Sequence, residues 1–343
     1  MLRNYHERRL SAQKDPLPTG AWLAFDELDR HADAYDDLVS QTPNVDHFCS
    51  STDWILPAQA AFAPSALPYV MAEEGACIAL MRIPAEPRHE VAVPLEAGWG
   101  LASPFAGSDP AQLAEMLGTM VEHAPHPPDA LFLSGIVRDS PLHEHVVLRL
   151  TGHYRIGMGP PSGRRSTSIT GGLDGFLSRR SSRFRASLRR ALRRANQGGL
   201  QLSYEADFDS AEAVVDRVMA VEAKSWKGRT GQGVDRGLAR RFYELMITRL
   251  VLRGRLRLVF VRQGETDMAF CLGGLFGETY RGLQVSFVEG YEPWSPGNLA
   301  QLEMIRGLSA EGIETYHLGM EMPYKARWAE AGLETITLAL LPW

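Results

Sequence analysis

The sequence predicts a mixed α/β protein of two domains, each a mostly antiparallel sheet flanked by helices. The 343 residues are 45% hydrophobic and 22% charged, enough to bury a large core, and about 150 residues per domain gives roughly two domains. Short apolar runs bounded by Gly, Pro or charged residues are typical of strands, and they alternate with segments of helical periodicity. These observations exclude a disordered chain and a small disulfide scaffold.

Residues 1–160 are expected to form the first domain. An acidic segment at 23–39 has helical character, and 110–122 is expected to be a second helix. The prolines of 123–130 predict a loop after that helix. Strands are expected at 68–72, 76–83, 90–95 and 130–136.

The segment Gly159–Arg165 is the expected domain boundary, because Gly and Pro interrupt the chain there and the composition then turns basic. The second domain is expected to cover 165–343. Its helices are predicted at 176–196, near 210–226 and at 236–253.

Three strands follow at Arg255–Arg262, Asp267–Phe276 and Tyr280–Val288, and short turns between them predict an antiparallel meander. A helix through Leu299 and Leu308 then leads to a strand near Thr315–Leu318, which makes a strand, helix, strand crossover. A last strand is expected at Glu334–Leu341.

The charge is unevenly distributed. The net charge is −5, yet eight arginines and no acid lie between Arg179 and Arg194, so this window carries +8 and the rest of the chain −13. The eight arginines do not share one helix face, and Phe184, Leu188, Ala191 and Leu192 supply the apolar seam. Two interpretations remain open: a solvated basic helix, or a surface that attracts a phosphorylated donor, an anionic acceptor or a tRNA backbone.

Three widely spaced cysteines, Cys49, Cys77 and Cys271, offer neither a disulfide framework nor a CxxC metal clip, so free thiols and no metal site are expected. Met1–Leu10 lacks the apolar region of a signal peptide, and no apolar stretch is long enough to span a membrane. We therefore expect a cytoplasmic protein that is a monomer or homodimer.

Three segments of the second half carry a family resemblance. Residues 184–199 (FRASLRRALRRANQGG), 295–301 (SPGNLAQ) and 316–332 (YHLGMEMPYKARWAEAG) resemble the FemAB-like and CelD-like branch of the GNAT acyltransferase superfamily. In the first half, 48–54 and 107–117 look like the amino-terminal part of tandem GNAT proteins. The resemblance implies two GNAT-like domains, the first degenerate, and an N-acyltransferase that works by direct attack within a ternary complex.

The SPGN turn is predicted to meet the donor. A Gly-containing turn that enters a helix exposes backbone N–H groups at the positive end of the helix dipole, and Pro296 suits the first helical turn, with Ser295 or Asn298 as its cap. The resemblance implies that amides around Gly297, Asn298 and Leu299 hold the pyrophosphate of an acyl-CoA, acetyl-CoA or longer. It also implies that a backbone N–H among Ser286, Phe287 and Val288 meets the thioester carbonyl.

The turn departs from the family signature Q/R-x-x-G-x-G/A, because it has only one glycine. An aminoacyl-tRNA donor, as in FemAB-type transferases, is therefore a second hypothesis, supported by the basic helix. A non-catalytic GNAT-fold protein that binds an anionic polymer or partner is a third.

Four residues are candidates for acid–base work. Glu289, His317 and Glu321 are candidate bases, each with an ordinary structural or surface role as the alternative. The resemblance implies that Tyr324 donates a proton to the departing sulfur.

The resemblance also places Lys325 and Arg327 in a YK-x-RW segment that contacts substrate. Trp226 precedes a Gly-rich loop that resembles an acceptor-facing lid. The acceptor amine, whether small molecule or part of the cell envelope, and the acyl chain length stay open.

Overall fold

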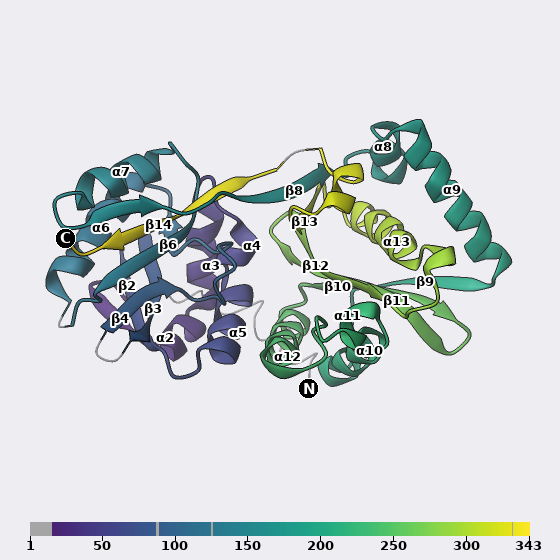
Figure 1. The fold of residues 1–343 in the computed structure, drawn as a ribbon, viewed down its shortest axis with the longest axis horizontal. Helices are drawn as coiled ribbons and strands as arrows, with labels where there is room; N and C mark the ends of the chain where they lie inside the picture. Colours follow the sequence, from purple (N-terminus) through teal and green to yellow (C-terminus); the bar gives the residue numbers. More distant parts are fainter. Residues whose placement is uncertain (1–15, 87–88, 125, 331) are drawn as a thin grey trace. The chain divides into compact units, whose positions relative to one another are not determined.

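The computed structural model describes residues 16–86, 89–124, 126–330 and 332–343 (Figure 1). They form two compact units. The first unit ends at Gly163 and resumes at Leu333–Trp343, whereas the second unit is Arg164–Gly332. The sequence prediction gave the last strand to the second domain, and the structure gives it to the first unit. Met1–Leu10, where no signal peptide is predicted, lies outside the described residues.

The first unit is a mixed sheet covered by helices. Its strands follow the order β1-β2-β3-β4-β6-β14, with β5 paired to β3 and β7 to β14, and only β4 and β6 run parallel among these pairs. The strands are β1 (Ala21–Leu23), β2 (Leu67–Glu73), β3 (Ala76–Glu86), β4 (His89–Pro94), β5 (Phe105–Gly107), β6 (Ala130–Ile136), β7 (Arg155–Met158) and β14 (Glu334–Leu341).

Helices cover this sheet around an apolar core. Leu80, Leu117, Leu133 and Leu338 are fully buried, and they join β3, α6, β6 and β14 in one cluster. Burial of this surface is what fixes β14 to the first unit. The helices are α2 (Phe25–Arg30), α3 (Ala32–Gln41), α4 (His47–Ser50), α5 (Thr52–Phe62), α6 (Pro110–His123) and α7 (Pro141–Leu150).

The second unit is built on a sheet of order β8-β13-β12-β11-β10-β9, in which only β12 and β13 run parallel. The meander and the crossover expected from the sequence are confirmed as β10, β11, β12, α13 and β13. The strands are β8 (Ser162–Ser168, which begins in the first unit), β9 (Leu200–Glu205), β10 (Leu256–Gln263), β11 (Thr266–Phe276), β12 (Thr279–Phe287) and β13 (Thr315–Met320).

Helices cover both faces of the second sheet (Figure 1). One face carries α13 with α8 and α9, and the other carries α10, α11 and α12. The helices are α8 (Gly172–Ser178), α9 (Ser182–Gln197), α10 (Ala211–Ala223), α11 (Trp226–Arg229), α12 (Gly237–Leu252) and α13 (Pro296–Ala310), with the 3-10 turns η1 (Glu292–Trp294) and η2 (Pro323–Arg327).

Some predicted elements are wrong in detail. The single helix expected at 176–196 is two helices, because Ser181 caps α9: its Oγ accepts the Phe184 N–H at 3.3 Å. Ser225 likewise ends α10 early and caps the short α11. Strands β8 and β9 were not expected, since β8 begins inside the predicted boundary loop.

The arginine window separates into two groups in the structure. Arg179 and Arg180 both bond Glu330, and Arg185 donates to the backbone carbonyl of Arg180 at 2.9 Å. The other five are exposed, form no ion pair with any residue in the described part of the chain, and cover an arc of about 140° on α9 at 3.6 residues per turn. They are Arg183, Arg189, Arg190, Arg193 and Arg194.

Glu330 ties the segment after η2 to the start of α9. Its Oε1 accepts from Arg179 Nε at 2.7 Å and from Arg180 Nη2 at 2.6 Å, and its backbone N–H donates to Ser166 O. Despite partial burial, these hydrogen bonds hold the pKa of Glu330 below its ordinary value of 4.5. The ionised carboxylate therefore stabilises the folded state.

The variant Glu330→Gln is expected to lose about 1.5–3 kcal/mol of stability at pH 7, the range for hydrogen bonds to a charged group. A depressed carboxyl pKa contributes stability that is complete above about pH 4.5 and is lost as the pH falls through the folded-state value. Urea unfolding at pH 7 and pH 3 measures this. The difference in the free energy of unfolding between variant and parent should be smaller at pH 3 than at pH 7. An equal difference at both pH values would assign the effect to packing.

Candidate functional site

The candidate site lies where β12 and β13 separate. The two strands pair only over Thr279–Arg281 and Thr315–His317, and beyond that point each has an edge that faces the other across an opening. A cavity of about 720 Å³ fills this opening, between the amino-terminal end of α13 and the short helix α11. The pocket is thus formed by two splayed parallel strands together with α13, the helix that connects them.

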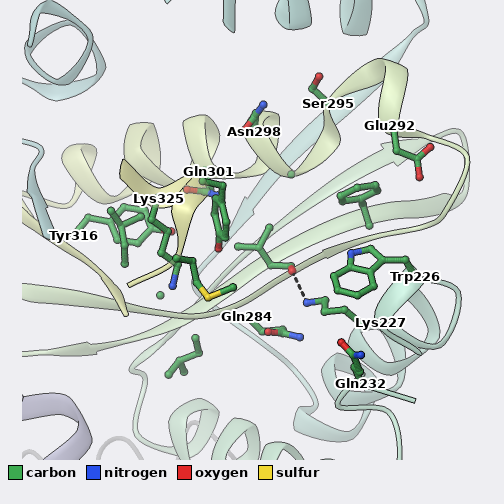
Figure 2. Close-up of a pocket in the computed structure, with 18 residues that line it drawn as sticks. Trp226, Lys227, Gln232, Gln284, Glu292, Ser295, Asn298, Gln301, Tyr316 and Lys325 are labelled. Atoms are coloured by element: carbon green, nitrogen blue, oxygen red, sulfur yellow. Dashed lines mark hydrogen bonds between the residues drawn. The ribbon is translucent and has the colours of Figure 1, made fainter. Parts of the chain in front are cut away.

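Residues from six elements, α11, β12, η1, α13, β13 and η2, line the cavity (Figure 2). Lys227 and Trp226 come from α11, Gln301 from α13, and Lys325 from η2. The described lining residues are Trp226, Lys227, Gln232, Gly282, Leu283, Gln284, Val285, Phe287, Glu292, Ser295, Gly297, Asn298, Gln301, Tyr316, Leu318, Met322, Tyr324 and Lys325.

The free edge of β12 is one wall of this cavity. Lys227 Nζ donates to the Val285 carbonyl oxygen at 2.9 Å, the contact drawn in Figure 2. Val288 N–H points the other way, to Met268 O on β11 at 2.9 Å. Because alternate residues of a strand bond to opposite sides, the N–H groups of Val285 and Phe287 face the cavity, and that of Ser286 faces β11.

Lys325 is the second ammonium in the cavity. Its Nζ donates to Met320 O at 2.8 Å and lies 5.8 Å from the Tyr324 ring centroid. Burial lowers the pKa of Lys325 to about 8, and the positive charges of Arg281 and Lys227 add to this. Burial also lowers the pKa of Lys227. Both lysines therefore lose their protons more easily than exposed lysines do.

Trp328 anchors the turn that carries Tyr324 and Lys325. It is 2% exposed, stacks on Phe176 with centroids 5.7 Å apart and meets the edge of Phe184 at 5.1 Å. The backbone N–H of Trp328 donates to Lys325 O at 2.8 Å. Tyr324, 45% exposed, faces the cavity, and burial of its hydroxyl raises its pKa, so the phenol keeps its proton.

The SPGN turn has fewer free donors than the sequence suggests. Ser295 adopts a left-handed conformation (φ 55°) and its side chain caps nothing. The N–H groups of Asn298 and Leu299 both donate to Ser295 O, at 3.0 and 3.2 Å, and Pro296 has no N–H. The Gly297 N–H has no backbone acceptor among the described residues, and Gly297 lies beside the side chains of Val285 and Phe287.

The structure brings some of the predicted residues together and not others. The cavity is lined by Trp226, Phe287, Ser295, Gly297, Asn298, Tyr324 and Lys325. Glu289 pairs with Arg229, and Glu321 pairs with Arg165, both at the surface. His317 lies between Tyr316 and Leu318 and so faces the opposite side of β13.

The remaining predicted residues also lie outside the cavity lining. Ser286 and Leu299 are buried, Val288 bonds β11, and Arg327 is exposed on η2.

Sequence reasoning missed five polar lining residues. Lys227 immediately follows the predicted Trp226, and Gln301 is the last residue of the segment 295–301 quoted for the resemblance, so both lie beside or inside segments that the sequence had singled out. Gln232, Gln284 and Glu292 carry no motif. They are revealed only by the fold.

The basic face of α9 approaches the rim of the site. Arg194, Gln197 and Gly198 line a hollow of about 270 Å³ together with Pro293 and Trp294 of η1. A Cβ on Gly198 would lie 2.2 Å from the Trp294 ring, so glycine is required for this close packing. Glu292 and Ser295, at the two ends of the same η1 segment, line the main cavity.

Metal ligands, disulfides and membrane spans were looked for among the described residues. Within them, no group of three or more His, Cys, Asp or Glu side chains is placed to hold a metal ion. Cys49, Cys77 and Cys271 are buried and form no disulfide. None of the described helices has the length and apolar character needed to cross a membrane.

Comparison with known proteins agrees with this geometry. Residues 182–326 match the family model of the acetyltransferase (GNAT) domain. A search of curated proteins finds no match.

Three solved structures share the fold. FemX is similar at a TM-score of 0.61 and 13% identity, over 89% of this chain and 95% of its own. A conserved protein of unknown function from Bacteroides thetaiotaomicron VPI-5482 is similar at 0.58 and 11%, over 90% and 97%. L-PGS from Bacillus licheniformis is similar at 0.52 and 13%, over 83% and 87%.

The splayed strands and the family match therefore lead to one conclusion: residues 182–326 match the GNAT domain model, and the chain has a FemAB-like fold of two GNAT-like domains.

Proposed function

We propose that this protein is an N-acyltransferase that moves an acyl group from an acyl-CoA to a primary amine. The observation that carries the proposal is the open edge of β12 beside two cavity ammonium groups, Lys227 and Lys325. A strand edge pairs with an amide-containing arm, and a buried cation stabilises negative charge that develops on a carbonyl oxygen.

The cavity residues divide the chemistry among themselves. The amine nitrogen attacks the thioester carbonyl carbon, the carbon–sulfur bond breaks, and one proton passes from nitrogen to sulfur. The Lys325 ammonium and the Phe287 N–H stabilise the carbonyl oxygen as it gains charge. Tyr324, whose raised pKa keeps its proton, donates to the sulfur.

Glu292 is proposed to take the role that the sequence gave to Glu289 and Glu321. It is the carboxylate among the described lining residues, and its Oε1 accepts the Gly290 N–H at 3.2 Å. A carboxylate at this place attracts a cationic amine and can accept its proton.

Acetyl-CoA titration of the purified protein tests the donor. We expect a rise in melting temperature that grows with ligand concentration, and release of free thiol when an amine is added. Native mass spectrometry of the purified protein reports any retained donor and its chain length. If neither CoA nor acyl-CoAs of several chain lengths change the melting temperature, the hypothesis of an acyl-CoA donor is rejected.

An aminoacyl-tRNA donor is the second candidate. Two observations favour it: the bonded amides of Asn298 and Leu299, and the five exposed arginines of α9 beside η1. Binding through several phosphates weakens steeply with salt, so affinity should fall by orders of magnitude between about 50 and 200 mM salt. Affinity for aminoacyl-tRNA that is absent or insensitive to salt contradicts this candidate. A non-catalytic binding protein would show no turnover with either donor.

A further inference from the structure

Two hydrogen-bond acceptors in the cavity are placed to accept from the N–H groups of a ligand. Gln301 is 4% exposed, lines the cavity from α13, and its Oε1 has no hydrogen-bond partner. The Val285 carbonyl oxygen on the β12 edge has Lys227 Nζ as its partner, at 2.9 Å. A buried acceptor without a partner destabilises the site until a donor meets it. A ligand that carries N–H groups would satisfy Gln301 and could replace Lys227.

Lys227 has a second position within reach. Its Nζ lies 3.9 Å from Oε1 of Glu222, a carboxylate that is fully buried. Oε1 already accepts from Gln284 Nε2 at 3.0 Å and from the Val234 N–H at 3.3 Å, whereas Oε2 has no partner. An ammonium that leaves Val285 therefore meets an unsatisfied carboxylate oxygen after a rotation of its own side chain.

The backbone that carries Lys227 is fixed, so the change is confined to the side chain. Arg236 Nη2 donates to Gly228 O at 2.6 Å, and the Gly228 N–H donates to Ser225 Oγ at 3.1 Å. A Cβ on Gly228 would lie 2.3 Å from Glu222 O, which leaves the loop no room to shift inward.

We propose that Lys227 is a specificity-determining residue of the donor site. In the free protein the Lys227 ammonium occupies the position at the β12 edge that an amide N–H of the acyl donor would take. It moves to Glu222 when an acyl donor with a pantetheine arm binds. The arm has two secondary amides, whose N–H groups are matched by Val285 O and Gln301 Oε1. An aminoacyl ester offers no amide N–H at its carbonyl. The inference rests on the proposed function.

The Lys227→Met variant tests this with two probes. S-acetylpantetheine has the arm and no phosphate, and adenosine 3′,5′-bisphosphate has phosphates and no arm. Removing the competing hydrogen bond should tighten S-acetylpantetheine binding about 3- to 10-fold by calorimetry, since one hydrogen bond is worth about 0.5–1.5 kcal/mol. Binding of the bisphosphate should be unchanged.

Lys224→Met is the matched control. It removes the same charge as Lys227→Met, but Lys224 is exposed and does not line the cavity. It should leave both affinities unchanged. Glu222→Gln should weaken S-acetylpantetheine binding when Lys227 is present. In the double variant with Lys227→Met it should have no effect on this binding, since the carboxylate acts only through the lysine.

Each alternative result has one meaning. Weaker or unchanged S-acetylpantetheine binding in Lys227→Met overturns the inference and leaves the acyl-CoA donor in place. If neither the parent nor Lys227→Met binds S-acetylpantetheine or acetyl-CoA, the donor and the inference both fail.

Discussion

Replacing Lys325 with methionine is expected to lower kcat for acyl transfer by about 10²- to 10³-fold, the usual cost of losing one group that stabilises an oxyanion. The side chain keeps its length and loses its charge. Donor affinity should change far less, because the charge matters most in the transition state. Steady-state kinetics with acetyl-CoA and an amine, set beside equilibrium binding of CoA, separate the two effects.

The pH profile of the parent enzyme provides the control. With the pKa of Lys325 at about 8, kcat should fall as the pH rises through about 8, because the ammonium loses its proton. Lys325→Arg should move this alkaline limb to higher pH. Since burial disfavours the charge, Lys325→Met should melt at or above the parent temperature. A rate that instead rises through pH 8 would assign Lys325 the role of a base.

Replacing Trp328 with alanine is expected to cost about 3–5 kcal/mol, the range for large aromatic residues in cores. Its indole is buried between Phe176 of α8 and Phe184 of α9, so the vacated space is enclosed by two helices. At roughly 2–4 °C per kcal/mol for a unit of this size, the melting temperature should fall by about 10 °C.

Arg327→Ala is the control for that experiment, because the neighbouring Arg327 is exposed and should change stability by less than about 0.5 kcal/mol. If Trp328→Ala still folds, its activity should also fall, since the turn that carries Tyr324 and Lys325 loses its anchor. Full activity together with a large loss of stability would show that other contacts hold this turn.

Much of the second unit can be predicted because its elements are signalled locally. Strands β10 and β11 are rich in apolar residues, short turns separate β10, β11 and β12, and α13 begins at a proline, so propensity and pattern agree. The Tyr324–Lys325 pair and Trp226 were instead predicted from the resemblance of their segments to a known family.

The rest depends on distance in space, which a single sequence does not contain. Nothing local distinguishes Glu222, Gln284 and Gln301 from other polar residues on amphipathic elements, and their role follows from the opening between β12 and β13. The candidate bases Glu289 and Glu321 were singled out by the sequence but do not line the cavity. They lie near strand ends and form surface ion pairs with Arg229 and Arg165.

The position of β14 has a consequence for the order of folding. The second unit is continuous in sequence and can fold as soon as it is made. The sheet of the first unit instead leaves the edge of β6 open until residues 334–341 arrive. During synthesis that exposed strand edge is a risk of wrong pairing. The closing strand of the first unit therefore becomes available only after the whole of the second unit has been made.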